Sequence, residues 1–579
     1  MQKALLSSLL IGLLSLTSLA QSYPQDYFSS PLNIPLILSG TFGELRSNHF
    51  HAGIDIKTQG REGLDVKAAA NGQVVRIAVS PYGYGNALYV RHPNGYTTVY
   101  AHLKEFAPQI EAWVKEQQYK QKSFYVNLFP SAGLFSVSKG EVIAQSGNSG
   151  GSGGPHLHFE IRDSRTEEPI NPLLFGYRIA DARNPEVRGV YAYPLDGHLN
   201  GRETRTSINL TNPRAGVYQF RWTQRAEGEL GFAIDVIDRL DGAWNANGPY
   251  KIEQFVNGVK TNEFRAERFS FAETRYLNAH IDYDLYDCCQ TRANRMWQLP
   301  GNSLRMYRDQ NNRGVVDIRP DSSYHLEWKI SDAAGNTTTL TGDVRYEALE
   351  TSGPVLAPEI SEQVRVNHSA SFSSNVRAME INMPANILYE TVFLDTAVYN
   401  GISSGYGNVY QWGRAGIPVH KHFEVALPLR DVPIQYHSKA VIVSLEDDMT
   451  RPDCWDGSTF INHNEPYIKA NVRAMGHFTI MLDTVAPRLS VISGIRNGSN
   501  LSTGNTIRLR VSDDLSGIKS YDAFIDGDWH LMSYDAKNNL LEVELDDWIT
   551  SGNHQLNVKV VDDRNNVTEL SVPFSYSLR

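Results

Sequence analysis

The stretch GQVVRIAVSPYGYGNALYVRHPNGYTTVYAHLK, residues 72–104, indicates how the N-terminal part of the chain folds. Three short runs within it, residues 72–79, 87–92 and 96–103, are rich in β-branched and aromatic side chains and are separated by turn residues. Asn94 and Gly95 lie between the last two runs, and this pair favours the turns that join two antiparallel strands. The stretch therefore predicts an antiparallel β-sheet.

The alternating pattern continues over residues 30–175 and is interrupted once. Within residues 107–121, Ile110, Trp113, Val114 and Gln117 recur at helical spacing, which predicts an amphipathic helix. Apolar residues alternate again in SFYVNLF, residues 123–129. We therefore expect one β-sheet domain that carries a helical insertion.

Long β-type segments with Asn, Asp and Gly turns dominate from about residue 180. LEWKISDAAGNTTTLTGDV (326–344) and LNVKVVDDRNNVTELSVPF (556–574) resemble each other, because each places an Asp-containing turn between two alternating strands. Such hairpins are typical of small β-sandwich domains, and their recurrence suggests related modules. The expected mainly β chain has an antiparallel sheet domain at 21–180 and β-sandwich (Ig-like) modules at 181–348, 353–484 and 485–579.

Length and charge agree with this organisation. A chain of 579 residues is too long for one hydrophobic core. It has 54 basic and 64 acidic residues and a net charge of −10, without a basic stripe, so nucleic acid is not an expected partner.

The N-terminus has the pattern of a secretory signal peptide at residues 1–20. Lys3 precedes an apolar run, and small residues follow at Ser18 and Ala20, so cleavage is expected after Ala20. No other stretch is apolar enough over sufficient length to cross a bilayer. We therefore expect an exported protein without stable membrane insertion, located in the periplasm, the cell envelope or outside the cell.

The chain has three cysteines, Cys288, Cys289 and Cys454, so at least one stays unpaired in an oxidising compartment. Cys288 and Cys289 are adjacent, which is poor geometry for an ordinary disulfide. A bond from either of them to Cys454 is left open.

Three short segments place histidine and carboxylate side chains on one side of a predicted strand. The shared faces are His51, Gly53 and Asp55 in HFHAGIDIK (49–57), Tyr100 and His102 in VYAHLK (99–104), and His156, His158 and Glu160 in HLHFEIRD (156–163). Aliphatic and aromatic residues occupy the opposite face of each segment. One face of the sheet is thus expected to collect several imidazoles and a carboxylate.

These residue types suit a catalytic zinc site, which needs three nitrogen or oxygen ligands and an open position for water. Further histidines beside the metal suit proton transfer and oxyanion stabilisation. A histidine pair alone is insufficient, because VHKHFE (419–424) nearly repeats PHLHFE but has Lys421 where Leu157 is expected to be buried. His420 and His422 are therefore interpreted as surface strand residues.

The motifs HAGIDI, YAHLK and GNSGGSGGPHLHFEIRD resemble those of the lysostaphin/LytM-type zinc endopeptidases that cut peptidoglycan cross-bridges. The resemblance covers about residues 35–175. It implies one zinc ion per chain bound by His51, Asp55 and His158, with His156 and His102 as the catalytic histidines. It also implies attack of an activated water on a peptide carbonyl, with His156 as base and His102 supporting the tetrahedral intermediate.

Two features depart from the family pattern. The family usually joins YAHL to KGEVIA by a short segment, whereas this chain has an insertion at about 105–137, interpreted either as a wall or lid of the groove or as a surface decoration. The C-terminal β modules are the second departure, and whether they bind the wall or a protein or act as spacers stays open.

The resemblance implies an exported zinc metalloendopeptidase acting on peptidoglycan stem peptides or cross-bridges. Two alternatives stay open: a non-enzymatic regulator or activator of another cell-wall hydrolase, and a secreted protease on Gly-rich proteins. Protonation of the ligands is expected to weaken zinc binding as the pH falls below about 6, near the ordinary histidine pKa.

Overall fold

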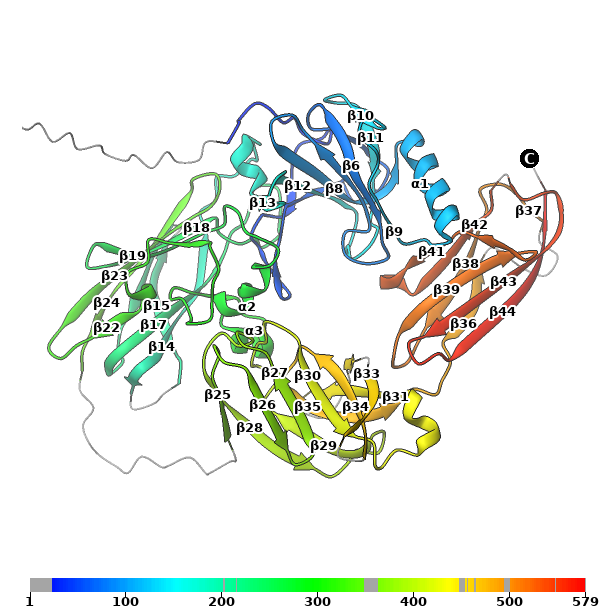
Figure 1. The fold of residues 1–579 in the computed structure, drawn as a ribbon. Coiled ribbons are helices and arrows are strands. Elements are labelled where there is room, and N and C mark those ends of the chain that lie inside the picture. Colours follow the sequence, from blue (N-terminus) through cyan, green and yellow to red (C-terminus); the bar gives the residue numbers. More distant parts are fainter. Residues whose placement is uncertain are drawn as a thin grey trace, which may run out of the picture.

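The structure is a computed structural model that describes all residues except 1–22, 201–203, 215, 348–362, 447–452, 456, 463–464, 494–499, 547 and 578–579. The predicted signal peptide therefore lies outside the described residues. The expected mainly β fold is confirmed. Figure 1 shows four parts that follow one another around a ring, from the N-terminal domain in blue to the last module in red. Within the described part of the chain, no helix is long and apolar enough to span a membrane.

The N-terminal domain is built on an antiparallel sheet in which β12 lies between β4 and β8. Its strands are β1 (Leu38–Gly40), β4 (Ile54–Lys57), β5 (Asp65–Lys67), β6 (Gly72–Val79), β7 (Asn86–Arg91), β8 (Tyr96–Phe106), β9 (Val126–Leu128), β10 (Ser136–Val137), β11 (Val142–Ser146), β12 (His156–Asp163) and β13 (Pro169–Ile170). A separate hairpin joins β2 (Leu45–Arg46) to β3 (His49–Phe50), and the 3-10 helix η1 (Pro172–Phe175) ends the domain.

The alternation of β12 fixes which side of this sheet is apolar. Leu157, Phe159 and Ile161 are fully buried in the core that also holds Ile54 and Tyr100. In an extended strand, His156, His158 and Glu160 then point to the opposite side. The order of strands places these three residues directly between β4 and β8.

The predicted helix is confirmed as α1 (Pro108–Gln121), and its Ile110 and Val114 are buried against the domain core. Its other side contacts the last module. The Tyr119 hydroxyl donates to Asp546 Oδ2 at 3.2 Å, its ring lies 4.8 Å from that of Trp548, and Lys115 Nζ lies 3.1 Å from Asp546 Oδ2. The insertion therefore joins the two ends of the ring (Figure 1), a contact that neither sequence-based interpretation included.

The first module follows the N-terminal domain and packs against it. Its strands are β14 (Glu186–Leu199), β15 (Thr206–Arg214), β16 (Val217–Arg221), β17 (Ala226–Ile237), β18 (Lys251–Val256), β19 (Val259–Arg265), β20 (Ala293–Arg295), β21 (Tyr307–Arg308), β22 (Val316–Ile318), β23 (Ser323–Ser331) and β24 (Thr337–Arg345). Its helices are η2 (Thr274–Tyr276), α2 (Leu277–His280), α3 (Tyr283–Cys289) and η3 (Asn312–Gly314).

The second module consists of two sheets that share one core. Its elements are β25 (Gln363–Val366), β26 (Phe372–Val376), β27 (Met379–Met383), β28 (Val392–Tyr399), β29 (Tyr406–Trp412), β30 (Phe423–Pro428), η4 (Ile434–Lys439), β31 (Ala440–Leu445), β32 (Asp453–Trp455), β33 (Gly457–Asn462), β34 (Glu465–Val472) and β35 (Gly476–Leu482).

The last module also has two sheets over one core. Its elements are β36 (Arg488–Ser493), β37 (Asn500–Leu501), β38 (Thr506–Ser512), β39 (Ile518–Ile525), β40 (Asp528–His530), β41 (Met532–Asp535), η5 (Ala536–Asn538), β42 (Leu540–Glu544), β43 (Gly552–Asp562) and β44 (Val567–Tyr576). The two similar hairpins predicted from the sequence are confirmed as β23 with β24 and β43 with β44.

The cysteines pair differently from the alternative left open by the sequence. A disulfide joins the adjacent Cys288 and Cys289 at the end of α3, and Cys454 is a free thiol. No bond to Cys454 forms because the two neighbours are already joined to each other.

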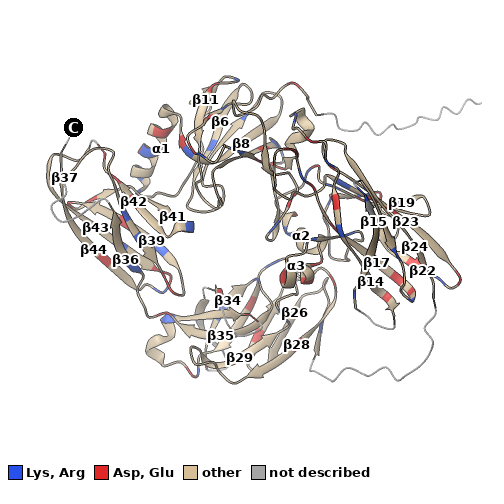
Figure 2. Ribbon diagram, turned by 180° about the vertical axis from the view of Figure 1, so that it is seen from behind, with Lys and Arg blue, Asp and Glu red and all other residues tan. Residues whose placement is uncertain are grey.

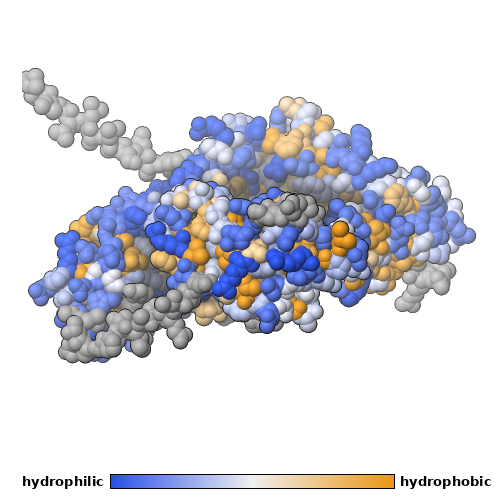
Figure 3. Space-filling view, turned by 60° about the horizontal axis from the view of Figure 1, so that its bottom comes forward, coloured by the Kyte–Doolittle hydropathy of each residue, from blue (hydrophilic) through white to orange (hydrophobic). Residues whose placement is uncertain are grey.

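Charged residues of both signs are distributed over the described part of the chain. Figure 2 shows Lys and Arg interspersed with Asp and Glu over all four parts of the ring. On the face in Figure 3, hydrophobic residues are interspersed with hydrophilic ones. For the described residues, Figure 2 agrees with the mixed charges of the sequence.

Candidate metal centre

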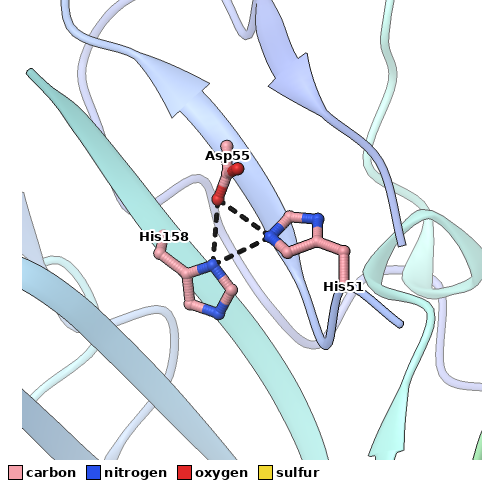
Figure 4. A group of neighbouring side chains, drawn as sticks. All are labelled: His51, Asp55 and His158. Atoms are coloured by element: carbon pink, nitrogen blue, oxygen red, sulfur yellow. Dashed lines mark hydrogen bonds and ion pairs between the residues drawn. The ribbon is translucent and has the colours of Figure 1, made fainter. Parts of the chain in front are cut away.

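Three predicted ligands meet on one side of the N-terminal sheet (Figure 4). Asp55 Oδ1 lies 3.0 Å from His51 Nε2 and 2.9 Å from His158 Nδ1, and the two nitrogens lie 3.0 Å apart. All three residues are buried. Two ligand atoms on a tetrahedral zinc ion are about 3.3 Å apart when each bond is about 2.05 Å. The triangle thus has nearly the size of a zinc ligand set.

Hydrogen bonds on the outer side of the rings fix which nitrogen faces the centre. His51 Nδ1 lies 2.8 Å from the carbonyl oxygen of Thr41, and His158 Nε2 lies 2.9 Å from Glu160 Oε1. Both oxygens only accept, so these two nitrogens carry the protons. Such partners orient metal-binding imidazoles and raise their basicity.

The inner atoms of the triangle are consequently all acceptors when both rings are neutral. Two nitrogen lone pairs and a carboxylate oxygen cannot hydrogen-bond one another, so the arrangement needs a positive charge at its centre. A metal ion or a proton supplies it. This donor set of two imidazoles and one carboxylate fits zinc.

The electrostatics of the metal-free chain agree with a proton at that position. Burial alone lowers the pKa of His158, but the hydrogen bonds and charges of Asp55 and Glu160 raise it to about 9. Burial raises the pKa of Asp55, yet His51, His156 and His158 hold it well below its ordinary value. The carboxylate is therefore ionised throughout the neutral range.

The segment around His51 departs from the single extended strand expected from the sequence. The chain leaves β3 at Phe50 and enters β4 only at Ile54, so His51 lies in the connection. Phe50 and Ala52 pack in a cluster with Phe264 and Phe269 of the first module rather than in the domain's own core. The neighbouring module thereby holds the segment that carries the first ligand.

Gly53 is needed for a close approach to β12. A Cβ atom at this position would lie only 2.4 Å from the carbonyl oxygen of Phe159 and 2.9 Å from Glu160 Cγ. Glycine at this position therefore lets the His51 segment lie close beside the strand that carries His158.

Glu160 has a role that the sequence did not assign to it. It is fully buried and accepts from the nitrogen of His158 that faces away from the centre, from Arg162 Nε at 2.6 Å and from the Tyr84 hydroxyl at 2.5 Å. Burial raises its pKa, but Arg162 and His158 lower it to about 2. Its place beside His158 on the predicted strand face was the available signal.

His156 and His102, the two predicted catalytic histidines, lie beside the triangle. His156 Nε2 is 3.4 Å from Asp55 Oδ1, and its Nδ1 is 2.8 Å from the carbonyl oxygen of Gly154. His102 Nδ1 is 2.9 Å from the carbonyl oxygen of Ser149, and its ring lies 4.8 Å from that of His156. Both Nδ1 atoms therefore donate to carbonyls, and both Nε2 atoms remain as acceptors in the neutral rings.

The expectation that Tyr100 and His102 share a face is wrong. His102 has a φ of +57°, which is uncommon for a residue other than glycine and breaks the strand alternation. Tyr100 lies in the apolar core, where its ring is 5.4 Å from that of Phe159. His102 instead points to the metal side, and such strained backbone clusters at functional sites.

Burial is the main cause that lowers the pKa of His102, and the nearby His158 and His156 lower it further, to about 3. The ring is therefore neutral at pH 7. It can accept a proton at Nε2, whereas donation from that atom requires an unfavourable second proton.

The glycine-rich loop before His156 has two parts. A Cβ atom on Gly150 would lie 2.3 Å from the amide nitrogen of Gly85, so this glycine serves packing of the loop. Beside Gly153 and Gly154 there is open space within 4 Å of such an atom. These two positions fit the expectation that an extended substrate can approach the backbone here.

His420 and His422 were wrongly interpreted as strand residues. Both precede β30, and the His420 ring stacks on Tyr276 of the first module at 4.3 Å. They lie in another module from the triangle of His51, Asp55 and His158, as expected.

Comparisons with known proteins agree with the local chemistry. Peptidase family M23 matches residues 49–119 and 133–172, and a Zu5-like domain matches residues 362–483. The DD-carboxypeptidase/endopeptidase Mpg of Neisseria meningitidis is 36% identical over 129 residues, which are 22% of this chain and 23% of that protein. The murein hydrolase activator NlpD of Escherichia coli is 33% identical over 135 residues, 23% of this chain and 28% of that protein.

The catalytic domain of lysostaphin from Staphylococcus simulans is a solved structure that is 23% identical, with a TM-score of 0.18, covering 24% of this chain and 91% of that one. The chain spans about a quarter of the length of the curated relatives that it matches. The matched residues include all three members of the triangle and both neighbouring histidines. The N-terminal domain of this chain belongs to peptidase family M23, of the LytM type.

Proposed function

We propose that the N-terminal domain is a zinc metalloendopeptidase that hydrolyses peptide bonds in peptidoglycan stem peptides or cross-bridges. The observation that supports it is the triangle of acceptors formed by His51, Asp55 and His158, whose geometry needs a cation. Two further histidines with available Nε2 atoms lie beside it.

In this proposal His51, Asp55 and His158 hold one zinc ion, and Glu160 and the Thr41 carbonyl orient the two rings. A zinc ion in such a site polarises a peptide carbonyl and lowers the pKa of a water molecule. His156 acts as the base, because its Nε2 accepts and lies on the same side as Asp55. It then returns the proton to the leaving amine.

His102 is assigned to the same proton transfer. Its neutral ring presents an acceptor, so it supports a negatively charged tetrahedral intermediate only after gaining a proton from the reaction. Its backbone strain and its bond to Ser149 hold the ring next to His156.

The substrate class follows from likeness to relatives whose names state a peptidoglycan role. Export, as the N-terminal pattern predicts, would bring the domain to that substrate. The name of NlpD as an activator supports a second candidate, a regulator of another murein hydrolase. The complete set of ligands and histidines favours the enzyme.

The test combines metal analysis with digestion of purified peptidoglycan, followed by mass spectrometry of the fragments. The native chain is expected to contain one zinc ion and to release peptide fragments. His51→Ala and Asp55→Ala are expected to lose zinc and activity together. His156→Ala is expected to keep zinc and to lose activity by about 10²–10⁴-fold, the range for a general base.

His49→Ala is the matched control, because His49 belongs to the same motif but is exposed, and its ring hydrogen-bonds to the Ser47 carbonyl. It is expected to keep zinc and full activity. A native chain without bound zinc, or a fully active His156→Ala variant, would refute the proposal. Zinc binding without any cleavage would favour the regulator.

A further inference from the structure

A second group of acidic side chains meets where the N-terminal domain joins the first module. Asp181 lies in the segment between η1 and β14, Asp238 directly follows β17, and Asp332 directly follows β23. One oxygen atom of each carboxylate lies within 4.8 Å of the others. The group therefore lies where the segment leaving the peptidase domain meets two turns of the module.

Two oxygens of this group are buried without any hydrogen-bond partner, namely Asp238 Oδ1 and Asp181 Oδ2. Asp238 is only 2% exposed and Asp332 only 3%. Asp332 is held by its turn, since its Oδ1 accepts from the amides of Gly335 at 2.7 Å and Asn336 at 2.9 Å. A buried, unpaired carboxylate oxygen is costly unless a cation or a proton compensates it.

Arg178 lines the same cavity as Asp181 and Asp238, and Arg183 lowers the pKa of Asp238, but these cations do not offset burial and the neighbouring carboxylates. Burial, followed by the charges of Asp181 and Asp332, raises the pKa of Asp238 to about 8, and the opposing effect of Arg183 is smaller. Burial, and after it Asp332, raises the pKa of Asp181 to about 6. In the metal-free chain, the raised pKa values of Asp181 and Asp238 favour bound protons at these carboxylates.

The group opens onto a cavity of about 420 Å³ that Asp181 and Asp238 line together with Thr41 and Tyr250. This space lies between the peptidase domain and the module. It gives an ion an entry path and leaves room for water molecules as additional ligands.

We propose that Asp181, Asp238 and Asp332 bind a hard divalent cation, calcium. All donors are carboxylate oxygens, whereas zinc and copper sites use nitrogen or sulfur. Calcium accepts six to eight oxygen ligands in flexible geometry, so three carboxylates and waters from the cavity suffice. Magnesium demands a more regular octahedron than one connecting segment and two turns provide.

The site has a structural consequence for the metal centre of the peptidase domain. It fixes the orientation of the first module, whose Phe264 and Phe269 pack against Phe50 next to His51. Thr41 also lines the cavity, and its carbonyl oxygen orients the ring of His51. Bound calcium is thus expected to steady the junction that positions the first zinc ligand.

A similar group, Asp483, Asp513 and Asp562, lies where the second module joins the last one: Asp483 follows β35, Asp513 follows β38 and Asp562 ends β43. Asp562 accepts from the amides of Arg564 and Asn566 much as Asp332 does in its turn. Among the described residues, no carboxylate oxygen of this second group is both buried and unpaired. It therefore serves as a comparison, and the proposal concerns the first group.

The test is a calorimetric titration of the full chain with CaCl₂, together with thermal melting with and without the ion. The native chain is expected to bind calcium saturably, with a dissociation constant of about 10⁻⁴ M or lower, the weaker end for calcium modules. Asp238→Asn removes one charge at constant shape. This variant is expected to bind calcium at least tenfold more weakly in the titration and to show a smaller calcium-dependent rise in melting temperature. Without calcium, it is expected to melt no lower than the native chain.

Asp181→Asn is the second variant, because Asp181 is partly exposed and less critical for folding. Asp343→Asn is the matched control, since Asp343 is an exposed residue of the same hairpin paired with His325, and its titration is expected to match the native one. His158→Ala is expected to lose zinc but to keep calcium binding, so failure of the peptidase proposal is recognised separately. A native chain without saturable calcium binding, or an Asp238→Asn variant that binds as the native chain does, overturns the inference.

Discussion

Replacement of Glu160 by Gln tests whether a carboxylate that touches no substrate tunes the metal centre. Gln has the same shape and can still accept from His158 Nε2, so the change removes the charge and keeps this hydrogen bond. Outer partners of metal-binding histidines are worth about 10–100-fold in metal affinity. Because this hydrogen bond survives in Glu160→Gln, we expect zinc affinity to fall by about tenfold, or about 1.4 kcal/mol, the lower end of that range.

The same substitution also affects folding, and the two effects must be separated. Arg162 is only 4% exposed and loses its 2.6 Å partner, while Glu167 at 3.7 Å and the ring of Phe271 at 4.6 Å remain. Breaking a buried ion pair lowers the free energy of unfolding by about 3–5 kcal/mol. Because Arg162 keeps its other partners, we expect a value near the lower end, about 3 kcal/mol. Denaturant unfolding of the metal-free chain measures this loss.

A double variant, Glu160→Gln with Arg162→Met, removes both charges of the pair. Its stability is expected to recover most of the loss, because the buried charge without a partner is gone. Its zinc affinity, measured by competition with a chelator, is expected to stay about tenfold below native. If zinc affinity recovers together with stability, Glu160 acts only through the fold and the reasoning is refuted.

Three further predictions concern the pH dependence of the site, the insertion and the packing. The raised pKa of His158, about 9, means that the metal-free ring holds its proton below that pH and loses it as the pH rises through it. Zinc binding to the metal-free chain is therefore expected to release about one proton per zinc ion at pH 7 and less than one above pH 9. Calorimetric titration in buffers of different ionisation enthalpy measures this number. A constant number of released protons from pH 7 to 10 contradicts the prediction. Tyr119→Ala is expected to weaken docking of α1 on the last module by about 1–3 kcal/mol and to speed hydrogen exchange in Pro108–Gln121. The control is Tyr125→Ala, which removes a ring that is 58% exposed. If hydrogen exchange in Pro108–Gln121 is equally fast in both variants, the contact of Tyr119 with the last module is refuted. Gly53→Ala is expected to lower the free energy of unfolding by about 1–3 kcal/mol, because the added methyl group meets the Phe159 carbonyl. The control Gly153→Ala is expected to change it little. Equal melting temperatures of the two variants contradict the close approach of Gly53 to Phe159.

The pH prediction shows where residue types alone mislead. The ordinary pKa of histidine places proton competition with zinc below about pH 6. The structure moves this competition upward, because Asp55 and Glu160 on either side of His158 stabilise its charged form. The sequence contains all three residues, but their contacts depend on the pairing of β4 with β12.

Local patterns were sufficient for much of the fold, and together with the family resemblance they named the candidate metal ligands. A strand has a period of two and a helix a period near 3.6, so alternation and helical spacing predicted the sheet, α1 and the repeated hairpins. The motifs around His51, His102 and His158 likewise named residues that the structure brings together. These properties depend on near neighbours in the chain, and the sequence displays them directly.

Contacts between distant segments decided the rest. The packing of Phe50 on the first module and the bond from His102 to the Ser149 carbonyl both involve residues far along the chain, and neither the break before Ile54 nor the left-handed backbone at His102 follows from a local pattern. The same holds for the carboxylates of Asp181, Asp238 and Asp332, which no local motif connects. Burial and long-range hydrogen bonds set proton positions and charge, so only the tertiary structure shows where a cation is needed.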